Sequence, residues 1–405
     1  MSTRMRPLRD TIPIAEARQI IHTHLTGIDR VERVDLSTAH DRVLAQDIVS
    51  AVDVPPFSRA AMDGYAVRAE DTFGASRAEP AILHCIEQVF TGQTPVHALH
   101  SRQCAEIATG APLPAGADAV VMVEESDSNG SDVRIFMPVY PKQNVGRQGA
   151  DIQSGQTVLR SGELLTPSKV GVLAALGTTA LSVFARPRVA ILSTGNEIVA
   201  PGEPLGAGQI YDINRFTIAA LVEQHGGTPR SYRTVADTID DLSRAVDECL
   251  ENDVLIFSGG SSVGERDLIL DVLAARGEVF FHGIAVKPGK PMAFGQIGGR
   301  LFFGMPGYPT SCLTNTYALF VPALRRLARL PAWTPRTVTV PLASRIVSAT
   351  GRHQFFTVRI EKDIAVPAFK TSGDITSMSR ADGYIEIPAH TDIVEAGEMV
   401  EVKLF

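Results

Sequence analysis

Hydrophobic and polar positions change their pattern several times along the chain. Residues 12–25 repeat apolar side chains at helical spacing, which predicts an amphipathic helix. Pro55 and Pro56 must end any helix that precedes them, and this predicts a domain boundary near residue 50. From about residue 81 to residue 149, short β-prone runs alternate with Gly and Pro turns, a pattern typical of a small β domain.

A helical pattern returns after this β-prone stretch. Thr166 suits a helix cap and Pro167 suits the first helical position, so a second helix is predicted to begin there. A β domain inserted into a helical one explains the return. We therefore predict a discontinuous N-terminal domain, residues 1–50 and 150–185, that carries an inserted β domain at residues 51–149.

Residues 186–330 alternate apolar strand-like runs with amphipathic helix-like runs. Such alternation predicts right-handed βαβ crossovers and a mainly parallel sheet with helices on both faces. After a short Pro-rich linker, the chain returns to brief β-rich runs. The predicted fold is therefore multidomain α/β and β: the helical and extended N-terminal domain, the inserted small β domain, a central three-layer αβα domain at 186–330, and a C-terminal β-barrel-like domain at 331–405.

Composition and charge narrow the class of protein. The chain has 405 residues, of which 44% are apolar and 20% are charged, so we expect it to fold throughout as several domains. The net charge of −7 argues against a general nucleic-acid binder, which should carry a basic stripe. Only seven lysines are present, and Lys287 and Lys290 lie in one short run. An anionic ligand must therefore be met by locally placed charge.

Targeting and cysteine patterns are those of an ordinary globular protein. The longest near-apolar run, residues 171–185, is shorter than the ~18 residues that span a bilayer, so no membrane helix is expected. The N-terminus lacks the apolar region of a signal peptide, which predicts a cytoplasmic location.

Four scattered cysteines without a C-x-x-C motif predict reduced core thiols rather than a zinc site or a disulfide framework.

Three loops of the predicted αβα domain are candidate ligand sites. Ligands of open α/β sheets bind at the carboxyl ends of the strands, and small residues there let a phosphate approach the backbone. Each candidate loop follows an apolar strand: residues 193–197 (STGNE), 258–265 (SGGSSVGE) and 304–311 (GMPGYPTS). None of them matches a dinucleotide or P-loop fingerprint, which disfavours a dehydrogenase or a P-loop ATPase.

Charged residues accompany these loops. Acidic residues beside the loops are Glu197, Asp212, Asp237 and Asp267. Mg²⁺ commonly pairs one or two carboxylates with substrate phosphate, so one or more of them can be magnesium ligands, and we take Asp237 and Asp267 as the candidates. Capping of the following helix explains Asp267 equally well. The segment at residues 286–295 (VKPGKPMAFG) carries the lysine pair. Spacing alone leaves that segment as either an anion site or a solvated turn.

Eight segments carry a family resemblance when they are taken in chain order: SRAAMDGYAVR, TGAPLPAGADAVVMVEE, GRQGADI, STGNEI, GQIYDINR, SGGSSVGERD, VKPGKPMAFG and GMPGYPTS. Together they resemble the molybdopterin molybdenumtransferase (MoeA) family, which is related to the gephyrin C-terminal region. The resemblance covers roughly residues 10–405.

The resemblance implies a homodimer of four-domain subunits, whose third domain resembles molybdopterin adenylyltransferase and faces the partner's N-terminal domains. It implies insertion of molybdate into adenylated molybdopterin, with release of AMP and assistance by Mg²⁺, to give the molybdenum cofactor. Molybdopterin adenylyltransferase is the pathway partner that it implies, and neither a nucleic acid nor a membrane is expected as a partner.

The resemblance also implies the site residues. Five acidic residues match positions needed for activity: Asp63, Asp151, Glu197, Asp237 and Asp267. The positions that match substrate-binding residues are Thr109, Ser258, Gly259, Gly260, Ser261, Lys287, Lys290, Pro291, Pro306, Pro309, Arg352 and Ser377. The two lysines are expected to face the oxyanion, and the prolines to hold their loops.

The chain departs from the family pattern at three motifs. Residues 57–60 read FSRA where the family commonly has F-D-N-S, and Ala150 stands before Asp151 where G-E-D is common. Tyr308 replaces the asparagine of P-G-N-P, which puts a tyrosine at the cleft. These departures bear on the pterin contacts and on the choice between molybdate and tungstate rather than on the reaction class.

Two other functions fit parts of the pattern. The αβα domain could act alone as an adenylyltransferase or a nucleotide pyrophosphatase, which consumption of ATP with unadenylated molybdopterin would support. A non-enzymatic scaffold that binds pterin or a partner protein is the second alternative, and the retained Asp63, Asp151 and lysine pair disfavour it.

Overall fold

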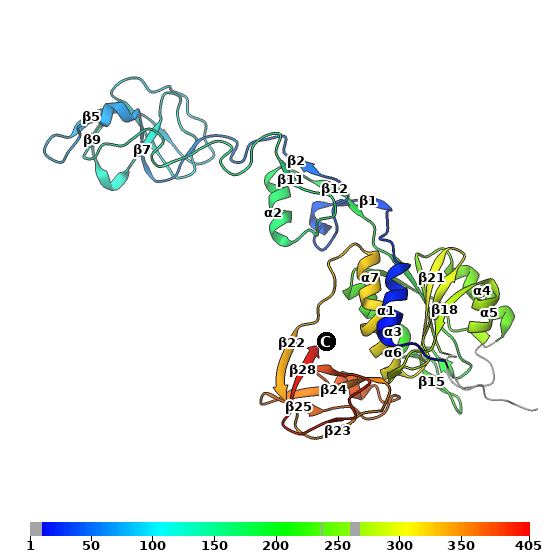
Figure 1. The fold of residues 1–405 in the computed structure, drawn as a ribbon. Helices are drawn as coiled ribbons and strands as arrows, with labels where there is room; N and C mark the ends of the chain where they lie inside the picture. The colour runs from blue at the N-terminus through cyan, green and yellow to red at the C-terminus, as the bar shows by residue number, and fades with distance from the viewer. Residues whose placement is uncertain (1–9, 236–237, 260–267) are drawn as a thin grey trace, which may run out of the picture. The chain divides into compact units, whose positions relative to one another are not determined.

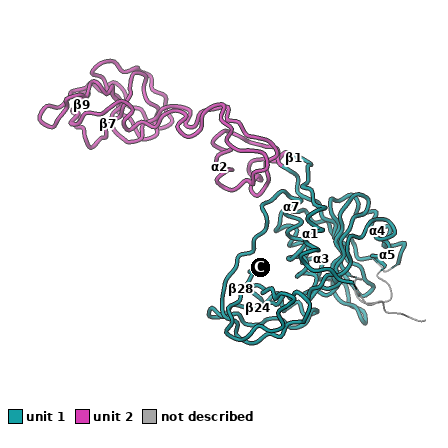
Figure 2. The backbone as a smooth tube through the Cα atoms, viewed as in Figure 1, with its two compact units in different colours: residues 1–32, 184–405 teal, residues 33–183 magenta. Residues whose placement is uncertain are grey.

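The computed structural model describes residues 10–235, 238–259 and 268–405 (Figure 1). It divides into two compact units, one of residues 33–183 and one of residues 1–32 with 184–405 (Figure 2). We call them the insert unit and the main unit. The finer division into four domains stays a prediction.

The insert unit is built around a six-stranded sheet of order β7-β4-β6-β5-β9-β8. The strands are short and separated by Gly and Pro turns, as the sequence predicts: β4 (Gly64–Val67), β5 (Ala81–Val89), β6 (Gln103–Ile107), β7 (Ala119–Met122), β8 (Ser126–Asn129) and β9 (Asp132–Ile135). The two faces of this sheet cover separate apolar clusters, one around Val67 and Val121 and the other around Ala66 and Val120. The small β domain is therefore confirmed.

The rest of the insert unit consists of paired short strands and one helix. Helix α2 (Pro167–Ala175) begins with proline in its first turn, as predicted. It packs through Leu173 into a third cluster with Leu44 and Val183. The short pairs are β1 (Val31–Asp35) with β12 (Ala180–Phe184), β2 (Ile48–Val49) with β11 (Thr157–Leu159), and β3 (Arg59–Ala60) with β10 (Val145–Gly146).

The main unit contains the predicted αβα domain. Its sheet has the order β16-β13-β17-β21-β20-β18, and the first four strands are mutually parallel. Strands β20 and β21 form the antiparallel hairpin that the sequence suggests. The bounds are β13 (Arg188–Ser193), β16 (Thr228–Ser231), β17 (Val254–Ser258), β18 (Gly277–His282), β20 (Ala293–Ile297) and β21 (Arg300–Met305).

Helices cover both faces of this sheet (Figure 1). Side chains alternate between the faces of a strand, so Ile191 joins one apolar cluster and Leu192 the other. Helices α4 (Ile239–Cys249) and α5 (Leu268–Arg276) pack on the Leu192 face. The Ile191 face is covered by α1 (Ile14–Thr23), α3 (Asn214–Gln224), α6 (Pro309–Asn315), a π-helical turn (Thr316–Phe320) and α7 (Val321–Leu327). The three-layer αβα architecture is confirmed.

Helix α1 packs in the main unit. Its apolar stripe, Ile14, Ala17 and Ile21, joins the core formed with α3, α7 and the sheet. The predicted N-terminal domain, residues 1–50 and 150–185, includes this helix, because helical periodicity shows that one face is buried but not which element it packs against.

The C-terminal β domain closes on itself. Its strands follow the order β19-β24-β26-β28-β22, and β25 pairs with the other edge of β24. Leu342, which directly follows β22, forms a β-bridge with Ala365 of β25, so the two edges of the sheet meet. The predicted barrel-like arrangement is therefore confirmed. The strands are β19 (Val286–Lys287), β22 (Thr337–Pro341), β24 (His353–Glu361), β25 (Ile364–Pro367), β26 (Gly383–Ile387) and β28 (Met399–Leu404); β23 (Ile346–Val347), β27 (Ile393–Val394) and α8 (Thr376–Ser379) complete the domain.

Two features outside the cores complete the description. None of the helices in the described ranges combines the length and the apolarity that crossing a bilayer demands. All four cysteines are free thiols; Cys85 is partly buried and the other three are buried.

Candidate functional site

Three strand ends lie level with one another at one edge of the αβα sheet. Ser193, at the end of β13, pairs in register with Ser258 of β17, and Ser258 pairs with Met305 of β21. The carboxyl ends of parallel strands meet at one edge. The three loops predicted as ligand sites therefore begin side by side.

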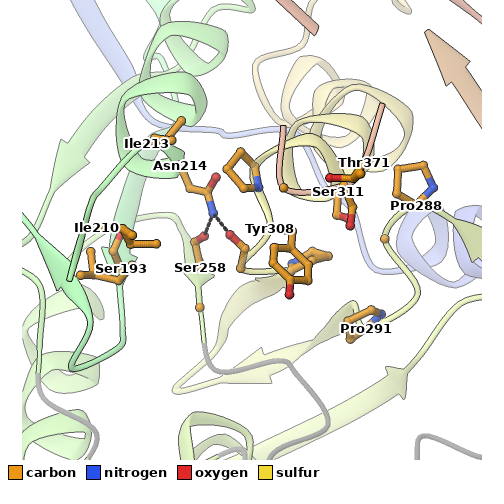
Figure 3. A pocket seen from close by; sticks show the side chains of 18 of the residues that line it. Ser193, Ile210, Ile213, Asn214, Ser258, Pro288, Pro291, Tyr308, Ser311 and Thr371 are labelled. Carbon is orange, nitrogen blue, oxygen red and sulfur yellow. Dashed lines mark hydrogen bonds between the residues drawn. The ribbon is translucent and has the colours of Figure 1, made fainter. Parts of the chain in front are cut away.

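The described residues of these loops line a cavity of about 1270 Å³ in the main unit (Figure 3). The loop after β13 contributes Glu197, and the segment around the lysine pair forms another wall. Of the predicted substrate-binding residues, those that line the cavity are Ser258, Gly259, Lys287, Lys290, Pro291, Pro306, Pro309 and Arg352.

The lysine-bearing loop is tied to the protein along its length. The backbone N–H groups of Ile284 and Met292 both donate to the carbonyl of Lys290, at 2.9 and 3.1 Å. The Asn315 side-chain amide of α6 donates to the carbonyl of Gly289 at 2.9 Å. Gly289 has φ +104°, and a Cβ there would lie 2.6 Å from the Asn315 amide oxygen, so only glycine fits. This is a fixed loop, not a free turn.

A strand pairing brings Arg352 to the same wall. Strand β19 runs parallel to β24, with Val286 opposite His353 and Lys287 opposite Gln354. The N–H of His353 also donates to the carbonyl of Ala285 at 2.9 Å. Arg352 directly precedes β24, so the pairing sets its backbone beside the lysine-bearing segment.

The described lining of the cavity has more positive than negative charge. Its basic residues are Lys287, Lys290, Arg352 and Lys370, and its acidic residues are Glu197 and Asp212. Asp212 is buried and forms an ion pair with Arg215, with 3.3 Å between the guanidinium Nε and the carboxylate Oδ2. Clustered cations in a concave site attract anions, and the protein as a whole is acidic. The cavity is therefore suited to an oxyanion or a phosphate.

Asn214 is a site residue that sequence reasoning missed. It starts α3, and its side-chain amide donates to Ser258 Oγ and to the carbonyl of Gly307, both at 2.8 Å (Figure 3). One side chain thus joins the end of β17 to the loop after β21. Its motif, GQIYDINR, is the one signal in the sequence that could have pointed to it.

Buried acceptors form part of the cavity floor. Ser193 Oγ and Asn214 Oδ1 are buried and have no hydrogen-bond partner among the described residues, and both residues line the cavity. Buried polar atoms are normally paired with protein, water or ligand. The floor can therefore accept hydrogen bonds from a ligand that carries N–H or O–H groups.

Asp63 and Thr109 lie together in the insert unit. The Thr109 backbone N–H and hydroxyl both donate to Asp63 Oδ1, at 2.7 and 2.9 Å. These bonds, the backbone one first, lower the pKa of the Asp63 carboxyl below its ordinary value. The next residue, Gly64, has φ +155°, and a Cβ there would lie 1.9 Å from the carbonyl oxygen of Val121. Glycine therefore lets the chain turn beside β7 with Asp63 exposed.

The remaining predicted residues have different surroundings. Asp151 is exposed in the insert unit, and its N–H donates to the carbonyl of Val54 at 3.0 Å. Ser377 is fully buried; its Oγ accepts from the Lys370 N–H at 3.1 Å, and it is not among the described lining residues. The structure therefore brings Lys370 to the cavity, with Ser377 behind it. Outside the described residues lie Asp237, Gly260, Ser261 and Asp267.

The described residues do not form a preassembled metal centre. Within them, no group of three or more His, Cys, Asp or Glu side chains is placed to hold a metal ion. Glu197 and the ion-paired Asp212 are the carboxylates of the described cavity lining. These two do not by themselves make a magnesium site.

The fold and the site define a class: multidomain proteins in which an αβα domain binds an anionic ligand at its strand ends. Three family models match the chain in order. They are described as "MoeA N-terminal region (domain I and II)" at residues 12–177, "Probable molybdopterin binding domain" at 190–326, and "MoeA C-terminal region (domain IV)" at 339–405.

Individual proteins match over nearly their whole length. The molybdopterin molybdenumtransferase of Haemophilus influenzae is 33% identical, with 97% of this chain and 98% of that protein covered. Molybdopterin molybdenumtransferase 2 of Mycobacterium tuberculosis is 34% identical, with 91% and 94% covered. Two crystal structures of molybdopterin biosynthesis MoeA proteins from Pyrococcus horikoshii are also similar. One has a TM-score of 0.86 at 40% identity and the other 0.81 at 32% identity; both alignments cover 98% of this chain, with 99% and 100% of the respective structures.

The chain belongs to the MoeA family. The resemblance found in its eight motifs is confirmed over the length of the protein.

Proposed function

We propose that this protein is a molybdopterin molybdenumtransferase, which inserts molybdate into adenylated molybdopterin and releases AMP. One structural observation supports the proposal independently of family membership. Three level strand ends and a tied lysine loop enclose one cavity that has both a cationic wall and unpaired acceptors. Such a cavity matches a substrate with a phosphate group and a polar heterocycle, together with a tetrahedral oxyanion.

The proposed roles follow from the positions of the charges. Lys287, Lys290 and Arg352 neutralise the molybdate and phosphate charges and hold them close together, which is electrostatic preorganisation. Asn214 keeps the β17 end and the loop after β21 at a fixed separation. Asp63, Asp151 and Glu197 are proposed to be required for turnover. The same role is proposed for Asp237 and Asp267, which lie outside the described residues.

Three further features of the reaction are proposed on the family relationship. The reaction requires Mg²⁺, which substrate phosphate oxygens and one or two carboxylates would hold. The protein works as a homodimer, which sedimentation equilibrium would test. It takes its substrate from a molybdopterin adenylyltransferase, and a cytoplasmic location stays a prediction.

A reconstituted assay tests the function. Purified protein is incubated with adenylated molybdopterin, Mg²⁺ and molybdate; AMP is measured by chromatography and active cofactor by reconstitution of a molybdenum-dependent apoenzyme. We expect one AMP per cofactor formed, and no cofactor when molybdate or Mg²⁺ is omitted. Absence of both AMP release and cofactor formation would exclude the transferase.

The same assay separates the alternatives. An adenylyltransferase acting through the αβα domain would consume ATP with unadenylated molybdopterin. A scaffold would bind the pterin without releasing AMP. The names of the relatives favour the transferase over both, because several proteins that match over most of the chain are molybdopterin molybdenumtransferases.

A further inference from the structure

We propose that the Tyr308 ring is the stacking surface for a planar heterocycle of the substrate, either its adenine or its pterin. The inference rests on the proposed function, since it concerns how that substrate is held. Adenylated molybdopterin carries these two rings together with phosphate. A cavity that binds it therefore needs a surface for a ring beside the cations that meet the phosphate.

Tyr308 is unusually open for an aromatic residue in a cavity wall. Its side chain is 64% exposed although the residue lines the cavity. Figure 3 shows it projecting among the lining side chains, in a view that also labels Ser258 and Pro291. Exposing an aromatic face to water forgoes the stabilisation that burial gives. A ligand ring that stacks on this face and buries it would restore that stabilisation.

The other aromatic residues of the described lining already have partners. Tyr211 is less exposed than Tyr308, at 41%, and its hydroxyl is held by the carbonyl of Glu203, to which it donates at 3.1 Å. Phe369 packs against Phe356, with 5.4 Å between the ring centroids. Within the described ranges, Tyr308 makes neither a hydrogen bond through its hydroxyl nor a ring contact. Its faces are therefore available to a ligand.

The backbone around Tyr308 holds the residue in place while leaving the ring uncovered. It precedes Pro309 at the start of α6, and the Cys312 N–H donates to its carbonyl at 2.9 Å. On one side lies Gly373, where a Cβ would meet the ring carbons at 3.8 and 3.9 Å. Gly373 thus lies beside one edge of the ring, in the loop that also carries Lys370. The ring lies in a wall shared with the cationic side chains, as a substrate with a ring and a phosphate requires.

Binding measurements on the full-length protein test the proposal. AMP and ribose 5-phosphate share the phosphate and the sugar but differ in the ring, and 6-hydroxymethylpterin phosphate carries the other ring. Calorimetry would compare these three probes on the wild type and on Tyr308→Leu. Stacking of a base on an aromatic side chain predicts a loss of about tenfold in affinity for the probe whose ring is stacked. Ribose 5-phosphate should bind equally to both proteins.

Two variants control the measurement. Tyr308→Phe keeps the ring and should bind like the wild type. Tyr140→Leu removes a tyrosine of similar exposure, 69%, in the insert unit, and should change nothing. Thermal unfolding of each variant within about 2 °C of the wild type would show that the fold is kept.

The outcomes separate this proposal from the proposed function. A loss confined to AMP assigns adenine to Tyr308, and a loss confined to the pterin probe assigns the pterin. Equal affinity of the wild type and Tyr308→Leu for both ring probes would overturn the stacking role while leaving the transferase intact. If the wild type bound none of the probes and released no AMP in the reconstituted assay, both proposals would fail together.

Discussion

At the scale of single residues, the lysine-bearing loop gives the sharpest test of the cavity. We expect Lys287→Ala and Lys290→Ala each to raise the molybdate concentration needed for half-maximal cofactor formation by roughly thirtyfold or more, because truncating a charged contact costs about 2–5 kcal/mol. Thermal stability should change little, since backbone bonds and the Asn315 amide hold the loop.

Lys362→Ala is a matched control for both lysine variants. Lys362 is an exposed lysine in the turn between β24 and β25, outside the described cavity lining. Equal losses of stability and activity in the Lys287 and Lys290 variants, with the control unaffected, would restore the view that this segment is only a turn.

A second prediction at this scale concerns the Asp63 carboxylate. Because the Thr109 N–H and hydroxyl lower its pKa, removing the hydroxyl in Thr109→Val should move the pKa of Asp63 upward toward the ordinary value of about 3.9. Thr109→Ser keeps the hydroxyl and should leave the pKa low. Carboxyl-carbon NMR titration of the two variants measures the shift. An unchanged titration in Thr109→Val would show that the backbone bond alone sets it.

At the scale of elements, an ion-pair network joins three strands of the C-terminal β domain to helix α1. Glu386 of β26 contacts Lys403 of β28 at 2.8 Å, His353 of β24 at 3.1 Å and Arg18 of α1 at 3.9 Å. Burial opposes ionisation of this carboxyl. The hydrogen bonds from His353 and Lys403 outweigh it and lower the pKa of Glu386 from 4.5 to about 2.

The lowered pKa gives a stability prediction with a definite sign. A carboxyl whose folded pKa lies below its unfolded pKa stabilises the fold above the unfolded value, and this stabilisation is lost as the pH falls from about 4.5 toward 2. The difference corresponds to roughly 3 kcal/mol. Glu386→Gln should therefore be less stable than the wild type at pH 7 and nearly equal to it at or below about pH 2, as measured by urea unfolding. A deficit that does not change with pH would assign the effect to packing.

Much of this element-level architecture follows from the sequence, and some of it cannot. Alternating strand and helix patterns predict a parallel sheet, and a parallel sheet places the loops after residues 193, 258 and 305 at one edge. The bridge from Asn214 to Ser258 and Gly307 depends on which loops meet in three dimensions, over separations of 44 and 93 residues. Local patterns carry no such information.

The same limit applies to the site as a whole. The lysines, the prolines and the glycine loops are recognisable as residue types suited to anions. The pairing of β19 with β24, which brings Arg352 to the wall, joins two-residue and nine-residue strands from different parts of the chain. A two-residue strand has no detectable periodicity, so its partner could not be predicted.

At the scale of the whole molecule, the insert unit interrupts the main unit at two adjacent points. The Ala185 N–H donates to the carbonyl of Arg30 at 2.7 Å, so the chain leaves and returns at the same place. Arg30 also pairs with Asp253, both guanidinium nitrogens lying 2.9 Å from the carboxylate oxygens. The Arg329 guanidinium lies over the Phe184 ring at 4.3 Å from its centroid. Both ends of the interruption are therefore held within the main unit itself.

A shortened chain tests whether the main unit alone binds the ligand while molybdenum insertion also needs the insert unit. Residues 33–183 would be replaced by a flexible Gly-Ser linker of about four residues, a loop whose closure costs little because the ends already meet. The main unit keeps its own cores and the entire described cavity. We expect it to fold cooperatively and to bind AMP within about threefold of the full-length protein. It should insert no molybdenum, because it lacks Asp63 and Asp151. Circular dichroism measures folding, calorimetry measures AMP binding, and the reconstituted assay measures molybdenum insertion.

Insertion at the full-length rate would show that neither Asp63 nor Asp151 is required for the reaction. Failure to fold would show that the main unit depends on the insert unit for its stability.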